Sequence, residues 1–208
     1  MRWWRGVLWL LATAGMVLWP EIGQPQRVTV GGWHLASFPV EQFAGYTSPF
    51  GPRGEEFHYG LDIAAPEGSY IRNWWAGQVV EVSQDGLCGT TLIIASGRWR
   101  HIYCHLRGRP VTVKGITYLD DPGSGLLVRE GQWVATGARI GRVGMTGRTT
   151  GPHLHWGLQY DGHWIDPAHV LRAMYRQRQA QLPSRTAPAL TVLAPGIRSA
   201  HPIKGSIM

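Results

Sequence analysis

The chain has 208 residues, of which 28 are glycine, and a formal net charge of +7. This length gives room for one domain with a substantial core plus terminal extensions, and the glycines favour short strands joined by tight turns. The charge would fit a nucleic-acid partner, but residues 1–166 hold 14 Lys or Arg against 13 Asp or Glu. The excess lies in residues 167–208, which hold six basic residues and no acidic one, so we expect no nucleic-acid binding.

Residues 1–20 are predicted to be an export segment. Two arginines precede the apolar run Gly6–Trp19, which is shorter than the roughly 20 residues of a membrane-spanning helix. The run predicts either a secretory signal peptide or an uncleaved N-terminal membrane anchor. We therefore expect an exported protein in the periplasm, the cell wall or the medium. A lead-in at residues 21–45, with a strand-like stretch at Arg27–Val30, follows.

The segment Phe57–Pro66 places His58 and Asp62 four residues apart. Imidazole and carboxylate are both common zinc ligands. The spacing would also suit one face of a helix, as in the HExxH metalloproteases. However, Gly60 lies between the two residues, no Glu directly follows the histidine, and no periodic apolar face surrounds the pair. We therefore predict that the pair does not lie on a helix.

The core is predicted to consist of short strands separated by Gly or Pro. The predicted strands are Gly77–Val82, Thr90–Ala95, Trp99–His105, Gln132–Ala135 and His153–Tyr160. Ser96–Arg98 has the composition of a hairpin turn, which places His105 at the end of the returning strand.

His153 and His155 are two residues apart in the last of these strands. Successive side chains of a strand point to opposite faces, so both imidazoles project from one face and can address one point in space. One of them could bind a metal while the other works beside it. With His58 and Asp62, such a ligand completes three protein ligands, which is the composition of a catalytic zinc site with a water in the fourth position.

The C-terminal part is predicted to be a helix at residues 168–182 and a basic tail at residues 183–208. The tail is rich in Pro, Ser and Ala and is predicted to lack fixed structure. We find no repeat and no separate wall-binding module.

Several ordered segments resemble the lysostaphin and LytM type of zinc endopeptidases, which cut the peptides of bacterial cell walls. The matching segments are Ser48–Arg53, the HxxxD of His58–Asp62, the YxHL of Tyr103–Leu106, a Gly-rich hairpin within residues 130–141, and the HxH of His153–His155. An HxH or HxxxD alone is a weak signal, whereas their combination in this order is specific.

The resemblance implies an all-β, single compact domain at residues 46–167, whose short antiparallel strands form a groove. It also implies that His58, Asp62 and His155 bind zinc and that His105 and His153 are the two catalytic histidines. The expected activity is zinc-dependent hydrolysis of peptide bonds in peptidoglycan by a monomer. The alternative is a non-catalytic protein of the same fold that binds and activates another wall hydrolase, such as an amidase.

Two further expectations concern residues outside these motifs. Cys88 and Cys104 are the only cysteines, and export to an oxidising compartment predicts a disulfide between them, although a two-residue turn at Gly97–Arg98 would place Thr91 opposite Cys104. The remaining histidines match no motif and are expected at the surface or in packing: His34, His101, His163, His169 and His201.

Overall fold

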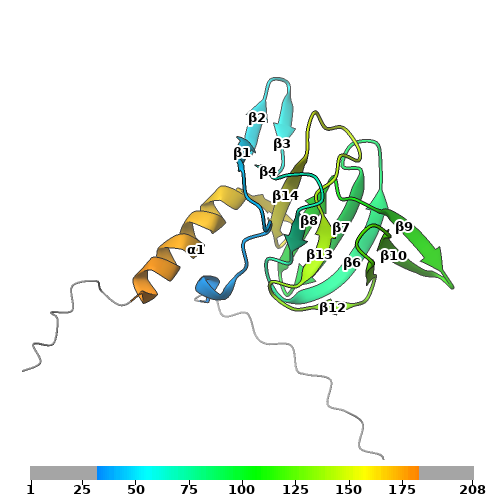
Figure 1. Cartoon of the computed structure of the whole chain (residues 1–208). Coiled ribbons are helices and arrows are strands. Elements are labelled where there is room, and N and C mark those ends of the chain that lie inside the picture. The colour runs from blue at the N-terminus through cyan, green and yellow to red at the C-terminus, as the bar shows by residue number, and fades with distance from the viewer. Residues whose placement is uncertain (1–31, 183–208) are drawn as a thin grey trace, which may run out of the picture.

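The computed structural model describes residues 32–182 (Figure 1). The predicted export segment, the strand-like Arg27–Val30 and the basic tail lie outside the described residues. No helix within residues 32–182 is long and apolar enough to cross a membrane.

The largest sheet within residues 32–182 is antiparallel and has eight strands. In spatial order its strands are β1 (Gly45–Ser48), β4 (Leu61–Ala64), β14 (His153–Tyr160), β8 (Trp99–Cys104), β7 (Thr90–Ser96), β6 (Gly77–Gln84) and β12 (Trp133–Val134), with β15 (His163–Ile165) paired to β14. Strands far apart in the sequence are therefore neighbours, and β14 lies between β4 and β8.

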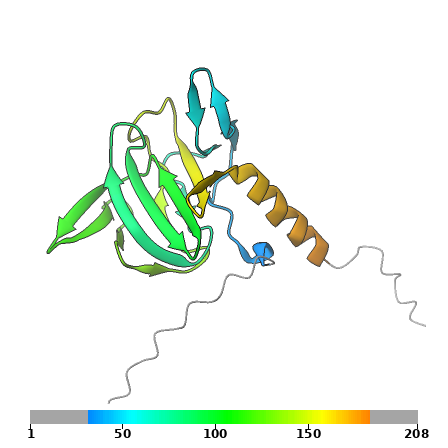
Figure 2. The ribbon, with the colours of Figure 1, turned by 180° about the vertical axis from the view of Figure 1, so that it is seen from behind.

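Three smaller sheets and two helices complete the fold. The sheets are β9 (Arg109–Val113) with β10 (Ile116–Asp121) and β11 (Leu126–Arg129), then β5 (Tyr70–Arg72) with β13 (Arg139–Arg142), then β2 (Gly51–Arg53) with β3 (Glu56–His58). The 3-10 helix η1 (Trp33–Leu35) contacts the helix α1 (Pro167–Gln181). Figures 1 and 2 show α1 and the β9–β10 hairpin on opposite sides of the molecule.

The core is built from alternating residues of the main sheet. Leu154, Trp156 and Leu158 of β14 are fully buried and point into it, together with Leu92 and Ile94 of β7. Because side chains alternate along a strand, His153, His155 and Gly157 lie on the opposite face of β14. The two histidines are thus presented by a strand whose other face is anchored in the core.

The helix α1 starts where the sequence supplies helix-start residues. The carboxylate of Asp166 accepts a hydrogen bond from the backbone N–H of Ala168 (2.8 Å), and Pro167 occupies the first helical position. Val170, Leu171 and Met174 are buried, so the helix is held by one apolar face.

The predicted all-β fold with a C-terminal helix is confirmed. The turn at Gly97–Arg98 is also confirmed, because Ser96 pairs with Trp99 and Gly97 has a φ of 60°. The predicted strand ending at His105 is one residue too long, since His105 itself has a φ of 61°. The sheet of β9, β10 and β11 was not predicted. β9 and β11 are mostly exposed and lack a clear apolar alternation.

Candidate active site

A tight turn between β3 and β4 brings His58 and Asp62 together. His58 ends β3, Asp62 is the second residue of β4, and Asp62 pairs directly with His155 of β14. Gly60 in the turn has no room for a side chain, because a Cβ there would lie 2.5 Å from Cε1 of His155. The prediction that His58 and Asp62 do not lie on a helix is confirmed, because they lie in β3 and β4.

The three side chains converge on one point. Oδ1 of Asp62 lies 3.0 Å from Nε2 of His58 and 2.9 Å from Nδ1 of His155, and these two nitrogens are 2.9 Å apart. Burial raises the pKa of Asp62, but the contacts with His155 and His58 outweigh it and hold the pKa well below its usual range. The carboxylate is therefore ionised near neutral pH. One carboxylate and two imidazoles whose ligand atoms lie within 4.8 Å of one another fit a zinc ion.

Two further contacts fix these ligands. The Nδ1–H of His58 donates to the carbonyl of Pro49 (2.7 Å), so Nε2 carries the lone pair that a metal needs. Nη2 of Arg53 donates to Oδ2 of Asp62 (3.0 Å). Sequence reasoning did not assign a role to Arg53, although it lies in the Ser48–Arg53 segment. Nothing in the sequence identifies the Pro49 carbonyl.

His105 and His153 flank the three-residue cluster, and their ring centroids are 4.7 Å apart. The Nδ1–H of His105 donates to the carbonyl of Thr146 (2.8 Å), and the Nδ1–H of His153 donates to the carbonyl of Gly151 (2.9 Å). A carbonyl can only accept, so Nδ1 of each ring carries a proton and Nε2 is the nitrogen left for other partners. Nε2 of His153 lies 3.7 Å from Oδ1 of Asp62, on the side where the three ligand atoms meet.

The backbone at His105 is unusual. Its φ of 61° is rare for a residue other than glycine. The conformation is held on both sides, because the N–H of His105 donates to the carbonyl of Cys88 (2.8 Å) and its carbonyl accepts from Gly144 (2.9 Å). Burial lowers the pKa of His105, although the hydrogen bond to Thr146 acts in the opposite direction. The lowered pKa favours the neutral ring near pH 7.

A groove of about 620 Å³ contains all five residues. Phe57, Tyr59 and Trp164 form one wall, with ring centroids 4.7 Å apart for the first pair and 5.1 Å for the second. Trp164 fits over Gly157, where a Cβ would lie 3.1 Å from its indole. Arg148 and Glu56 pair across the rim (2.8 Å). The sequence gives one usable sign of this wall: Gly157 falls on the same face as the two histidines.

Residues outside the cluster of five behave differently. Trp156, which lies between His155 and Gly157 but on the opposite face of β14, is fully buried. His101 is also buried, packs against Trp74 with centroids 4.8 Å apart, and has a pKa lowered to about 3 by burial. Cys88 and Cys104 are free thiols in the structure, and the neighbouring Cys104 thiol lowers the pKa of Cys88. The structure therefore does not contain the predicted disulfide, and the formation of this bond stays a prediction.

Part of this chain is similar to curated relatives. It is 33% identical over 117 residues to the peptidoglycan DD-endopeptidase ShyA of Vibrio cholerae, covering 56% of this chain and 23% of the relative. It is 30% identical over 148 residues to an uncharacterized metalloprotease of Haemophilus influenzae, covering 67% of this chain and 28% of the relative. The matched region thus spans about a quarter of the length of these relatives.

Solved structures share the architecture. A Pseudomonas aeruginosa structure assigned to peptidase M23 has a TM-score of 0.51 and 31% identity over 72% of this chain and 53% of that chain. Lysostaphin of Staphylococcus simulans, at 21% identity and a TM-score of 0.50 over 74% of this chain and 60% of that chain, shares the fold. The sequence model of Peptidase family M23 matches residues 56–167, which contain all five residues of the site. The chain therefore belongs to Peptidase family M23.

Proposed function

We propose that this protein is a zinc-dependent endopeptidase that hydrolyses peptide bonds in peptidoglycan. The observation that carries the proposal is the convergence of five side chains from separate segments on one groove, with the ligand atoms of His58, Asp62 and His155 within 4.8 Å of one another. Relatives named as peptidoglycan DD-endopeptidases support the substrate class.

His58, Asp62 and His155 would hold the metal. When bound in such a site, zinc lowers the pKa of a coordinated water to about 7 and polarises the scissile carbonyl. The donor set supports this assignment, because Asp62 is ionised and its Oδ2 is occupied by Arg53, which leaves Oδ1 for the ligand position.

His105 and His153 would act as general base and general acid. Each ring has Nδ1 tied to a backbone carbonyl, so Nε2 is oriented toward the groove and free to accept or return a proton. This suits a neutral imidazole that accepts a proton from the attacking water and, as an imidazolium, donates one to the leaving amine. In its charged form each ring could also stabilise the oxyanion of the tetrahedral intermediate.

The rival function is a non-catalytic regulator of the same fold that binds another wall hydrolase. Loss of a metal ligand or a catalytic histidine would favour that reading, and this chain keeps all five residues. We further propose that the protein is exported, through a signal peptide or an anchor in residues 1–20, and acts as a monomer.

The test is hydrolysis of purified peptidoglycan, measured as soluble peptide release. We expect release by the parent, loss with a chelator and recovery with added zinc. Release that is unaffected by full removal of metal would overturn the metal-dependent mechanism. No release by the zinc-loaded protein, together with stimulated hydrolysis by an added amidase, would favour the regulator.

A further inference from the structure

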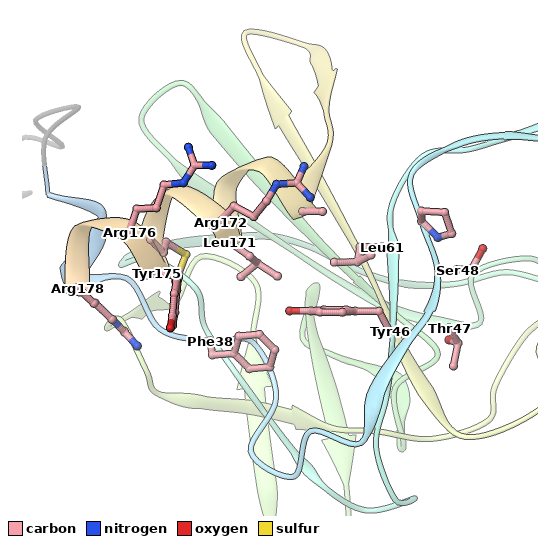
Figure 3. Close-up of a pocket in the computed structure, with 13 residues that line it drawn as sticks. Phe38, Tyr46, Thr47, Ser48, Leu61, Leu171, Arg172, Tyr175, Arg176 and Arg178 are labelled. Atoms are coloured by element: carbon pink, nitrogen blue, oxygen red, sulfur yellow. The ribbon is translucent and has the colours of Figure 1, made fainter. Parts of the chain in front are cut away.

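A second cavity lies between α1 and β1, away from the groove. It has a volume of about 640 Å³, and none of the five site residues lines it. Its floor is apolar and well packed, because Leu61 and Met174 are each 3% exposed. The rim of the cavity is exposed to solvent, because Tyr46 is 54% and Tyr175 is 65% exposed. Figure 3 shows the Tyr46 ring directed from the strand toward the helix.

One side of this cavity is the edge of a sheet. β1 is the terminal strand of the main sheet and pairs only with β4 among the strands that the structure describes. Tyr46, Thr47, Ser48 and Pro49 are consecutive, and all four line the cavity. The register between β1 and β4 shifts between Tyr46 and Ser48, and this irregularity lets consecutive residues face the same cavity. Because β1 is the terminal strand, the backbone groups on its other edge have no strand partner within residues 32–182 and are available there.

The other side carries positive charge. Arg172, Arg176 and Arg178 of α1 line the cavity, and no Asp or Glu does so within residues 32–182. Arg178 donates to the carbonyl of His34 (3.1 Å). Arg172 lies 3.9 Å from a carboxylate oxygen of Asp166. Arg176 makes no ion pair within the described part of the chain. Figure 3 shows Arg172 and Arg176 projecting from the same side of the helix.

We infer that this α1–β1 pocket binds an extended acidic segment of a partner protein. Such a segment can add to the exposed edge of β1 through its backbone, place a bulky apolar side chain over Leu61 and Met174, and pair an Asp or Glu with Arg172 or Arg176. Tyr and Arg are also the residue types that contribute most to protein interfaces.

A membrane surface fits this site less well. Helices that lie on membranes insert a protruding apolar face into the boundary of the bilayer. Here the apolar surface is recessed between a helix and a strand edge, and a strand edge offers directional hydrogen bonds that a second strand satisfies.

The test uses a phage-displayed library of random ten-residue peptides, selected on the purified full-length protein. We expect enriched peptides in which a bulky apolar residue stands near Asp or Glu. The Arg172→Glu/Arg176→Glu double variant should weaken their binding at least about tenfold, and Tyr175→Ala should also weaken it. Arg109→Glu is the matched control, because Arg109 is exposed on β9 at the opposite side of the molecule.

Two further readouts complete the test. Bound peptide should slow amide hydrogen exchange in β1, and all variants should release peptide from peptidoglycan at the parent rate, which separates this site from the proposed catalysis. A library that yields no enriched peptide, or peptides that bind the double variant as tightly as the parent, would overturn the inference. If the double variant instead lost binding to phosphatidylglycerol vesicles while no peptide bound, the pocket would be a lipid site.

Discussion

Arg53 and Asp62 form an ion pair that gives the two oxygens of the Asp62 carboxylate different partners. Oδ2 accepts from Nη2 of Arg53 at 3.0 Å, whereas Oδ1 faces His58 and His155 at 3.0 and 2.9 Å. Arg53 is thus a positioning residue: it keeps the carboxylate in the orientation in which one oxygen meets the two imidazole nitrogens.

Removing this guanidinium should weaken zinc binding without abolishing it. We expect Arg53→Met to lose about 10- to 100-fold in zinc affinity, the usual effect of removing a partner of a metal ligand. Arg53→Lys should recover part of the loss, because it keeps the charge but not the geometry of the guanidinium. Competition with a chromophoric chelator measures the affinity. Arg148→Met, which breaks an exposed pair with Glu56 at the rim, is the control and should bind zinc as the parent does. An unchanged affinity in Arg53→Met would contradict the positioning role.

The two flanking histidines should be needed for hydrolysis but not for metal binding. We expect His105→Ala and His153→Ala to keep the fold and about one zinc per chain while losing about 10² to 10⁴ in rate, the range for a positioned general acid or base. Soluble peptide release is compared with the parent, and zinc content is measured on the same samples. If either variant hydrolysed peptidoglycan at the parent rate, that histidine would have a structural role only. His163→Ala, an exposed histidine of β15, is the control.

Some features of this site could be predicted from the sequence, and others could not. Both segments that supply the proposed ligands are local patterns: His58 and Asp62 flank a glycine turn, and His153 and His155 lie two residues apart in a strand. Their positions could therefore be predicted, as could β14 itself, whose bounds match the prediction. The backbone at His105 could not, because its φ of 61° depends on hydrogen bonds to the carbonyl of Cys88 and from the N–H of Gly144, which are distant in sequence.

The role of Arg53 and the aromatic wall are also products of tertiary structure. Arg53 reaches Asp62 because β2 folds back on β3, a short hairpin whose strands have no clear alternation in the sequence. Trp164 meets Tyr59 only because β15 turns back on β14. The sequence around Arg53 and around Trp164 does not predict either contact.

Cys88 and Cys104 are predicted to form a disulfide in an oxidising compartment. Their thiols are in contact, and the contact lowers the pKa of Cys88, the less buried of the two, which favours the reactive thiolate. The bond would close a loop of about 15 residues, worth roughly 3 kcal/mol in the chain-entropy estimate, and would fix the chain just before His105. Thiol titration of the denatured, unreduced protein should find no reactive thiol after export. Two reactive thiols per chain in exported material would contradict the prediction.

The buried ion pair of Asp121 and Arg142 should make stability depend on pH in the acid range. Arg142 donates two hydrogen bonds to Asp121 (2.6 and 2.7 Å), and these lower the pKa of the carboxyl despite its burial. A lowered pKa adds stability above the unfolded value of about 4, and that contribution is lost as the pH falls below it. We expect Asp121→Asn to cost about 1–3 kcal/mol at pH 7, with a smaller difference from the parent at pH 3.

Urea unfolding at both pH values, with chelator in every sample, measures this difference. The control is Asp161→Asn, which breaks the exposed pair with Arg98 and should cost about 0–1 kcal/mol. A difference between the parent and Asp121→Asn that grew on acidification would contradict the assignment.

The zinc content of the parent and of Asp62→Ala tests the central claim most directly. Asp62 supplies one of three protein ligands, so its loss should abolish tight binding. Elemental analysis of the parent, purified without chelator, should find about one zinc per chain, and the variant should contain none after the same purification. Full zinc occupancy in folded Asp62→Ala would contradict the ligand assignment and the mechanism that rests on it.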